Sequence, residues 1–260
     1  DVYSVFGQIE LDVFERGELA LAARYDEEER EVSNNVPNVL NAQAYGGGTA
    51  PINPAFDGSG TDSIPDRDET FDEFQPKITY THAVTDDANV YASYGKGFRS
   101  GGFNSIGSAA TVDNAFGSYA TAPQNLRDDY DKEVTDTFEI GVKSLWLDNR
   151  LRFNAAAFYT EIDDYQFFNF YAGPFGILRV VNNIDEVEIY GAEFDFAWAL
   201  HDYVTISGGY GLIDTEIKEN KNRAYTEGND VPYAPESSGA LSLDFKMPVW
   251  NELEFVSRLD

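Results

Sequence analysis

The chain has 260 residues, and its 46 acidic and 18 basic side chains give a formal net charge of −28, which excludes a nucleic-acid-binding surface because phosphate groups need Lys and Arg. It has no Cys, so disulfide frameworks and thiolate metal sites are excluded as well. No run of about 18 apolar residues occurs, so a transmembrane helix is excluded, whereas a β-barrel that crosses a membrane needs no such run.

Alternation of apolar and polar residues dominates the chain and predicts an all-β protein, because no segment keeps helical spacing over three turns. The first residues, DVYSVFGQIE, lack the Met, basic segment and apolar segment of a signal peptide, so we expect a piece of a longer or processed protein. The first hairpin is predicted around Glu15, Arg16 and Gly17, with Val13 facing Leu19.

A long polar connection is predicted over residues 32–70, because this stretch is rich in Gly, Pro, Asn and Asp. At its end, Asp66, Asp68, Thr70 and Asp72 have alternate spacing that suggests a calcium loop, but Phe71 stands where a Gly is needed for the sharp turn. A solvated acidic loop is therefore the favoured interpretation of this segment.

The second hairpin is predicted around Asp86 and Asp87, with Tyr80 facing Tyr94. The stretch that follows, YGKGFRSGGFN, misses the dinucleotide-binding pattern because Ser100 stands where the third Gly belongs and no helical run follows. Counting from the turn puts one set of side chains on the inward face: Tyr91, Ser93, Gly95, Gly97 and Arg99. We interpret the stretch as the upper end of a strand that opens into a long loop over residues 100–132.

The third hairpin has the most regular pattern in the chain. The runs FEIGVKSLW and LRFNAAAFYT flank a tight turn at residues 147–150. Pairing about this turn sets Trp146 opposite Leu151 and Phe138 opposite Tyr159, so the apolar faces coincide without a register slip. Another long connection is predicted over residues 167–185.

The fourth hairpin is predicted around His201, with Trp198 facing Val204, and a long connection follows over residues 218–234. The fifth hairpin turns at residues 248–251. It joins two sets of residues on one face: Gly239, Leu241, Leu243 and Phe245 with Leu253 and Phe255.

Five hairpins imply about ten antiparallel strands, with short turns at one end and long loops at the other. A soluble sandwich has no reason to separate its loops by length, whereas an outer-membrane barrel has short periplasmic turns and long extracellular loops. Runs of about 9–14 residues suit tilted strands that cross a bilayer. Trp146 and Trp198 lie beside short turns, and Tyr159 and Tyr210 lie roughly 20 Å further along, as two aromatic girdles would. The sequence therefore predicts a partial transmembrane β-barrel whose apolar face meets lipid and whose polar face lines the lumen.

Four motifs in combination, GFRSGGFN, EIGVKS, RLRFNAAAFY and IYGAE, resemble those of TonB-dependent outer-membrane receptors, and the resemblance covers nearly the whole chain. It implies that residues 1–260 are part of a receptor β-barrel domain, without the plug domain and the terminal strand. It also implies uptake of a scarce ligand, a ferric siderophore first of all, across the outer membrane of a Gram-negative bacterium. The implied partners are the TonB complex through the missing N-terminal region, the receptor's own plug domain, and outer-membrane lipid and lipopolysaccharide.

Other functions and ligands stay open at this point. A passive outer-membrane porin or channel is one alternative, and a soluble secreted β-protein is another. Cobalamin, haem or a carbohydrate could replace the siderophore. No nucleophile motif is present, so no enzyme and no cofactor are expected, and His82 and His201 have no neighbours at ligand spacing, so no metal site is expected.

Aromatic side chains concentrate on the long-loop side, and clusters of exposed aromatic residues mark recognition surfaces. We predict that six residues of the loops and the lumen mouth bind the ligand: Arg99, Phe103, Asn104, Tyr165, Phe167 and Phe168. The alternative for these aromatic side chains is packing of one loop on another. Gly95 and Gly97 are predicted to face the plug, because a strip without side chains lets the barrel wall approach it closely.

Overall fold

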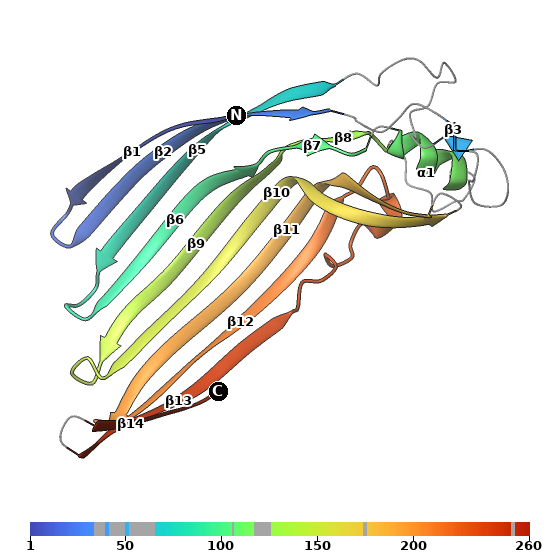
Figure 1. Cartoon of the computed structure of the whole chain (residues 1–260). Helices are drawn as coiled ribbons and strands as arrows, with labels where there is room; N and C mark the ends of the chain where they lie inside the picture. The colour runs from blue at the N-terminus through green and yellow to red at the C-terminus, as the bar shows by residue number, and fades with distance from the viewer. Residues whose placement is uncertain are drawn as a thin grey trace.

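The computed structural model describes residues 1–33, 40–41, 50–51, 66–105, 107–116, 126–173, 176–250 and 253–260. These residues form one ten-stranded antiparallel sheet built from five successive hairpins (Figure 1). The strands, in their order across the sheet, are β1 (Val2–Val13), β2 (Gly17–Val32), β5 (Arg67–Ala83), β6 (Ala88–Arg99), β9 (Glu133–Trp146), β10 (Leu151–Gly173), β11 (Gly176–His201), β12 (Val204–Glu219), β13 (Ser237–Trp250) and β14 (Leu253–Leu259). The predicted all-β fold with ten antiparallel strands is confirmed, as a section of a barrel that does not close on itself.

Apart from the short connection between Gly173 of β10 and Gly176 of β11, the connections separate by length between the two ends of the sheet (Figure 1). Short turns at residues 14–16, 84–87, 147–150 and 202–203 lie at one end. The long connections at the other end carry short elements: β3 (Leu40–Asn41), β4 (Ala50–Pro51), β7 (Gly102–Phe103), α1 (Ser108–Phe116), β8 (Asp129–Tyr130) and the 3-10 helix η1 (Ala224–Thr226). Among the described residues, no helix is long and apolar enough to span a membrane.

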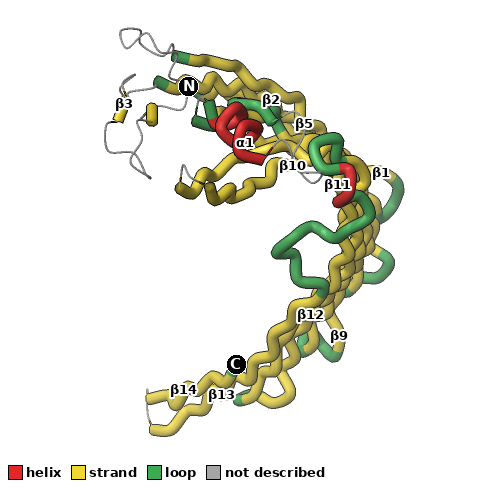
Figure 2. Tube along the Cα trace, turned by 90° about the vertical axis from the view of Figure 1, so that its right-hand side faces the viewer, coloured by secondary structure: helices red, strands yellow, loops and turns green. Residues whose placement is uncertain are grey.

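The sheet curves into a trough with a convex and a concave face (Figure 2). The convex face carries exposed apolar side chains from successive strands: Ile9, Leu11, Ile78, Val90, Ile140, Phe194, Leu212 and Leu241. A row of rings crosses four neighbouring strands on this face, with centroid distances of 4.9 Å for Tyr94–Phe138, 6.5 Å for Phe138–Tyr159 and 4.8 Å for Tyr159–Tyr190. This row has the position of the girdle predicted to lie away from the short turns.

The concave face carries the alternate, polar set of side chains. The Asn154 amide donates to the Asp195 carboxylate at 3.0 Å, and the Tyr91 hydroxyl donates to Glu139 at 2.5 Å. Tyr91, Asn154 and Asp195 line a hollow of about 720 Å³ on the inner wall of β6 and β9–β13. The predicted division into an apolar outer face and a polar lumen face follows from strand alternation alone.

The pairing register confirms one predicted hairpin and corrects three others. In the third hairpin, Trp146 pairs with Leu151 and Phe138 pairs with Tyr159, as predicted. In the first hairpin, Val13 pairs with Gly17 and not with Leu19. Two further expected pairs are shifted by two residues: Tyr80 pairs with Ala92, and Trp198 pairs with Ile206. In the fifth hairpin, for which no individual pair is predicted, Leu253 pairs with Trp250. A shift of two residues keeps every side chain on its face, so alternation does not distinguish these registers.

The connection predicted over residues 167–185 is wrong in most of its length. β10 and β11 stay paired to Gly173 and Gly176, so this hairpin extends far beyond its neighbours and its outer end bends over the concave side (Figure 2). Asp164 has a positive φ of 54° within β10, a conformation that Asp adopts more readily than most residues. Tyr165 and Phe167 beyond it pack with Ile162 in one cluster, although simple alternation would separate them.

The short helix α1 was not predicted from the sequence. Its Val112 is fully buried and packs with Tyr171 and Val180 of the β10–β11 hairpin. The Asp128 carboxylate accepts hydrogen bonds from the backbone N–H groups of Gly107, at 2.6 Å, and Ala109, at 2.9 Å, at the start of the helix. Because the helix has only about two turns, it depends on this cap and on the tertiary contact rather than on a strong sequence pattern.

Candidate functional site

A cavity of about 540 Å³ lies where the concave face meets the long loops. The outer ends of β6, β10 and β11 and the segment 231–234 enclose it. Its floor consists of Ile189, Ile213 and Thr215, which point inward from β11 and β12. We call it the mouth cavity, because it lies at the end of the trough that carries the long loops.

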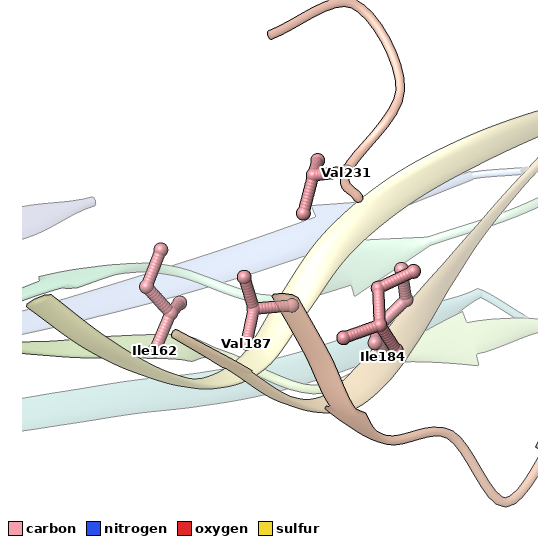
Figure 3. Close-up of a cluster of buried hydrophobic side chains, with 5 residues drawn as sticks. Ile162, Ile184, Val187 and Val231 are labelled. Atoms are coloured by element: carbon pink, nitrogen blue, oxygen red, sulfur yellow. The ribbon is translucent and has the colours of Figure 1, made fainter. Parts of the chain in front are cut away.

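One wall of the mouth cavity is the connection between β12 and β13, which folds back onto the sheet. Figure 3 shows Val231 of this connection over Ile162 and Val187, with Ile184 beside them. The Val231 N–H donates to Thr215 Oγ1 at 3.0 Å, and the Gly228 N–H donates to the Ile217 carbonyl at 2.9 Å. Burial of an aliphatic side chain contributes about 1.5–3 kcal/mol, so the connection is held in place by apolar contacts as well as by hydrogen bonds.

Arg99 enters the mouth cavity from the end of β6. Its Nη2 donates to Glu133 Oε2 at 2.5 Å and to the Gln166 carbonyl at 3.2 Å. The same Glu133 oxygen accepts the Gln166 N–H at 2.7 Å, so this carboxylate joins β6, β9 and β10. The Arg99 side chain is still 54% exposed, which leaves part of its guanidinium open to the cavity.

The aromatic wall of the mouth cavity comes from the β10–β11 hairpin. The rings of Phe167 and Phe168 are stacked with their centroids 5.8 Å apart, and the guanidinium carbon of Arg179 lies 4.7 Å from the centroid of the Phe168 ring. Burial, and then the Glu133 carboxylate, raise the pKa of Tyr165. A Tyr hydroxyl is protonated at neutral pH and can donate a hydrogen bond. The wall thus combines planar apolar surface with donors and positive charge.

A second hollow of about 200 Å³ in the long loops has the opposite electrostatic character. It is lined by Asp131, Asp164 and Asp185 together with Arg127 and Lys221. Burial raises the pKa of Asp164, and the charges of Asp131 and Asp185 raise it further, which shows that these carboxylates repel one another. An anionic ligand would therefore favour the mouth cavity over this hollow.

The mouth cavity brings together four of the six predicted ligand-binding residues: Arg99, Tyr165, Phe167 and Phe168. Phe103 and Asn104 lie outside its lining. The Phe103 ring lies 4.8 Å from the Arg67 guanidinium carbon, and the Asn104 amide bonds to both the N–H and the carbonyl of Val181 at 2.8 Å. Asn104 is buried and fixes the loop after β6 to the edge of β11, so a ligand would have to displace backbone contacts to reach it. Ligand binding by these residues stays a prediction.

The two glycines predicted to face a plug lie on an open part of the concave wall. A Cβ atom at Gly95 would meet Lys77 Cγ at 3.6 Å, and one at Gly97 would meet Thr135 Oγ1 at 3.0 Å. No aromatic ring covers either of them, whereas the Tyr91 ring covers Gly141 with contacts of 2.6 Å to a Cβ placed there. That Gly95 and Gly97 face a plug stays a prediction.

The residues of the mouth cavity that sequence reasoning missed include Tyr130, Arg179 and Tyr233. Arg179 was overlooked because residues 167–185 were interpreted as a loop, in which no residue has a defined face. Tyr233 has a positive φ of 68° and a side chain exposed to 92%, which puts an aromatic ring at the rim. The run FFNFY before the turn of the hairpin was the available signal, since aromatic residues at alternate positions favour a strand over a loop.

The chain was compared with known proteins. The family model described as TonB dependent receptor-like, beta-barrel matches residues 1–259. A probable TonB-dependent siderophore receptor, PiuA of Acinetobacter baumannii, is 27% identical over 186 residues, which cover 68% of this chain and 23% of that protein.

Solved structures of the same fold extend over almost the whole chain. The ferric yersiniabactin uptake receptor FyuA of Yersinia pestis matches with a TM-score of 0.66 at 15% identity, over 99% of this chain and 33% of that one. The closed form of the ferric-catecholate import receptor Fiu of E. coli K12 matches with a TM-score of 0.64 at 20% identity, over 94% of this chain and 32% of that one. This chain therefore spans about a third or less of the length of these proteins. With a family match over nearly all its residues, the chain belongs to the TonB-dependent receptor β-barrel family, whose members are outer-membrane proteins of Gram-negative bacteria.

Proposed function

We propose that this chain is the ligand-facing section of a receptor that takes up a ferric siderophore across the outer membrane, with energy relayed by the TonB complex. The mouth cavity carries the proposal, because it joins charged, aromatic and hydrogen-bonding groups at the end of the lumen that meets the long loops. Such a mixture of apolar walls and a few convergent polar groups is typical of small-molecule sites.

Relatives and structural neighbours support the ligand class. The curated relative is described as a probable siderophore receptor, and two neighbours are described as receptors for ferric yersiniabactin and for ferric catecholates. Another neighbour of the same fold is the copper transporter OprC, with a TM-score of 0.63 at 16% identity. Fold likeness alone therefore does not select the ligand. The lining of the mouth cavity and the description of the relative that is 27% identical together favour a siderophore.

The remaining partners follow from the same proposal. The polar concave face, with Gly95 and Gly97, would contact a plug domain contributed by the rest of the protein. That plug would couple the barrel to TonB, and lipid with lipopolysaccharide would cover the convex apolar face. The family is one of receptors and transporters, and uptake rather than catalysis is the role that this arrangement supports.

Uptake of radioactive iron tests the proposal in the full-length receptor, expressed in a Gram-negative strain that lacks its own siderophore receptors. We expect replacement of both Phe167 and Phe168 by Ala to lower the uptake of radioactive iron, supplied as a ferric siderophore, at least fivefold. The reason is that the aromatic wall of the cavity is lost. Ile177→Ala is the matched control, since Ile177 lies on the same hairpin, is exposed and does not line the cavity.

Two controls decide the interpretation of this experiment. Equal amounts of each variant in the outer membrane must first be shown, so that a folding defect is not taken for a binding defect. Uptake must also stop in a strain without TonB, since uptake that continues there would indicate a passive channel. Unchanged uptake by the Phe167 and Phe168 double variant would remove the mouth cavity from the proposed function.

A further inference from the structure

Arg179 differs from the other cation of the mouth cavity in its partners. Arg99 is held by Glu133, whereas the structure gives Arg179 no ion pair and no hydrogen bond among the described residues. Its one specific contact is the face of the Phe168 ring, with the guanidinium carbon 4.7 Å from the ring centroid. Arg67, Arg150 and Arg223 also have no carboxylate partner among the described residues, but each of them donates a side-chain hydrogen bond, to the Asp128 carbonyl, the Ala199 carbonyl and the Tyr171 hydroxyl respectively.

The stacked position leaves the donors of Arg179 available. A guanidinium that lies over an aromatic ring keeps the N–H groups at its edge free. Two of these N–H groups can donate parallel hydrogen bonds, in the guanidinium plane, to two oxygen atoms of one anion. Arg179 pairs with Phe170 in the β10–β11 ladder, so a rigid hairpin rather than a loop sets its position. Phe170 contacts Phe168 edge to face, with centroids 5.5 Å apart, and thereby supports the ring under the guanidinium.

Charge balance then indicates the sign of the ligand. Glu133 offsets Arg99 inside the cavity, so Arg179 leaves the lining with a positive charge that no carboxylate of the described residues pairs with. A ligand in this cavity is expected to bring the missing negative charge, because binding then desolvates a complementary pair rather than a lone cation. The Phe167, Phe168 and Tyr165 rings add planar surfaces against which an aromatic ring of the ligand would stack.

We propose that Arg179 determines ligand specificity, and that the mouth cavity selects an anionic ferric complex with catecholate-type groups, aromatic rings that carry adjacent anionic oxygens, over a neutral hydroxamate complex. This inference rests on the proposed function, since it names the class of siderophore that the same site takes. Arg179 would donate to the oxygens of one such ring, while the Phe168 face holds the guanidinium in place.

Binding to the purified full-length receptor tests this inference. Quenching of intrinsic fluorescence gives the Kd for two probes, an iron(III) tris-catecholate complex of negative charge and a neutral iron(III) trishydroxamate complex. The unmodified receptor is expected to bind the tris-catecholate at least tenfold more tightly. Arg179→Gln should raise the Kd for the tris-catecholate at least tenfold and change the Kd for the trishydroxamate less than twofold.

Lys221→Gln is the matched control, because it removes a cation from the same end of the molecule, where Lys221 pairs with Asp185 outside the mouth cavity. We expect this variant to bind both probes as the unmodified receptor does. The inference is overturned if Arg179→Gln binds the tris-catecholate normally, if it weakens both probes equally, or if the unmodified receptor prefers the trishydroxamate. In that last case the proposed siderophore uptake would stand, whereas failure to bind or import either ferric complex would overturn the proposed function itself.

Discussion

At the scale of single residues, aromatic rings on neighbouring strands explain two glycines of the concave face. The Phe158 ring lies over Gly191, and the Tyr91 ring lies over Gly141 while its hydroxyl donates to Glu139. A Cβ atom at Gly191 would overlap the Phe158 ring, and one at Gly141 would come within 2.6 Å of the Tyr91 ring. A ring that covers a glycine shields the strand backbone there, and this pairing pins the strand register.

Gly191→Ala is therefore expected to destabilise the barrel by about 1–3 kcal/mol, since the added methyl group forces the Phe158 ring out of its position. The loss of stability is measured by unfolding the receptor in urea. The folded fraction at each urea concentration is determined from the heat-dependent shift of the barrel on electrophoresis. Gly95→Ala is the control, because its Cβ would meet Lys77 Cγ at an ordinary distance of 3.6 Å. Equal stability of the two variants would contradict this role for the Phe158 ring.

At the scale of elements, the connection after β12 behaves as a built part of the wall rather than as a free loop. Val231 fills a site between Ile162 and Val187. Within the connection, Asn220 donates its backbone N–H to Glu227 Oε1 and its side-chain amide to Thr226 Oγ1. Arg223 reaches across to the Tyr171 hydroxyl of β10 at 2.7 Å. These contacts hold residues of the mouth cavity that would otherwise lack a fixed position.

Replacement of Val231 by Ser should loosen this connection, because it removes a buried side chain that contributes about 1.5–3 kcal/mol to the contact. We expect amide hydrogen exchange over residues 226–234 to become at least tenfold faster, as mass spectrometry of the full-length receptor would show. Tyr225→Ala serves for comparison, since Tyr225 belongs to the same connection and is 56% exposed. Unchanged exchange in Val231→Ser would mean that the hydrogen bonds alone hold the connection.

At the scale of the whole molecule, the curved sheet separates a convex apolar face from a concave polar face (Figure 2). In the proposed function, outer-membrane lipid covers the first, and water or a plug domain contacts the second. Neighbouring residues of one strand thus have opposite environments, which Ala156 and Ala157 of β10 illustrate. Ala157 is exposed beside Ile140 on the convex face, and Ala156 lies beside Glu193 on the concave face.

Ala157→Lys is expected to cost about 2–4 kcal/mol, because a charge near the middle of the lipid-facing band must leave water. Ala156→Lys should cost far less, since its ammonium group would face the lumen near the Glu193 carboxylate. The fraction of folded receptor recovered from outer membranes measures both effects. A larger loss for Ala156→Lys than for Ala157→Lys would reverse the assignment of the two faces.

Strand alternation and turn chemistry determined most of the fold from the sequence alone. The five hairpins, the two faces and the separation of short turns from long loops all follow from local patterns, and the third hairpin was predicted in register because a tight turn fixed its pairing. The motifs also indicated the family, which the match over residues 1–259 confirms. Sequence patterns also indicated four residues of the mouth cavity as candidates. Arg99 lies in the stretch YGKGFRSGGFN, and the others lie in one aromatic stretch: Tyr165, Phe167 and Phe168.

Only the tertiary structure decided the remaining features. Registers that differ by two residues share the same alternation, so the positions of the other hairpins depend on turn geometry and cross-strand packing. The outward extension of β10 and β11, the helix α1 and the inward fold at Val231 depend on contacts between residues far apart in the chain. Arg179 acquires its place over Phe168 through the same long-range pairing, which no local pattern records.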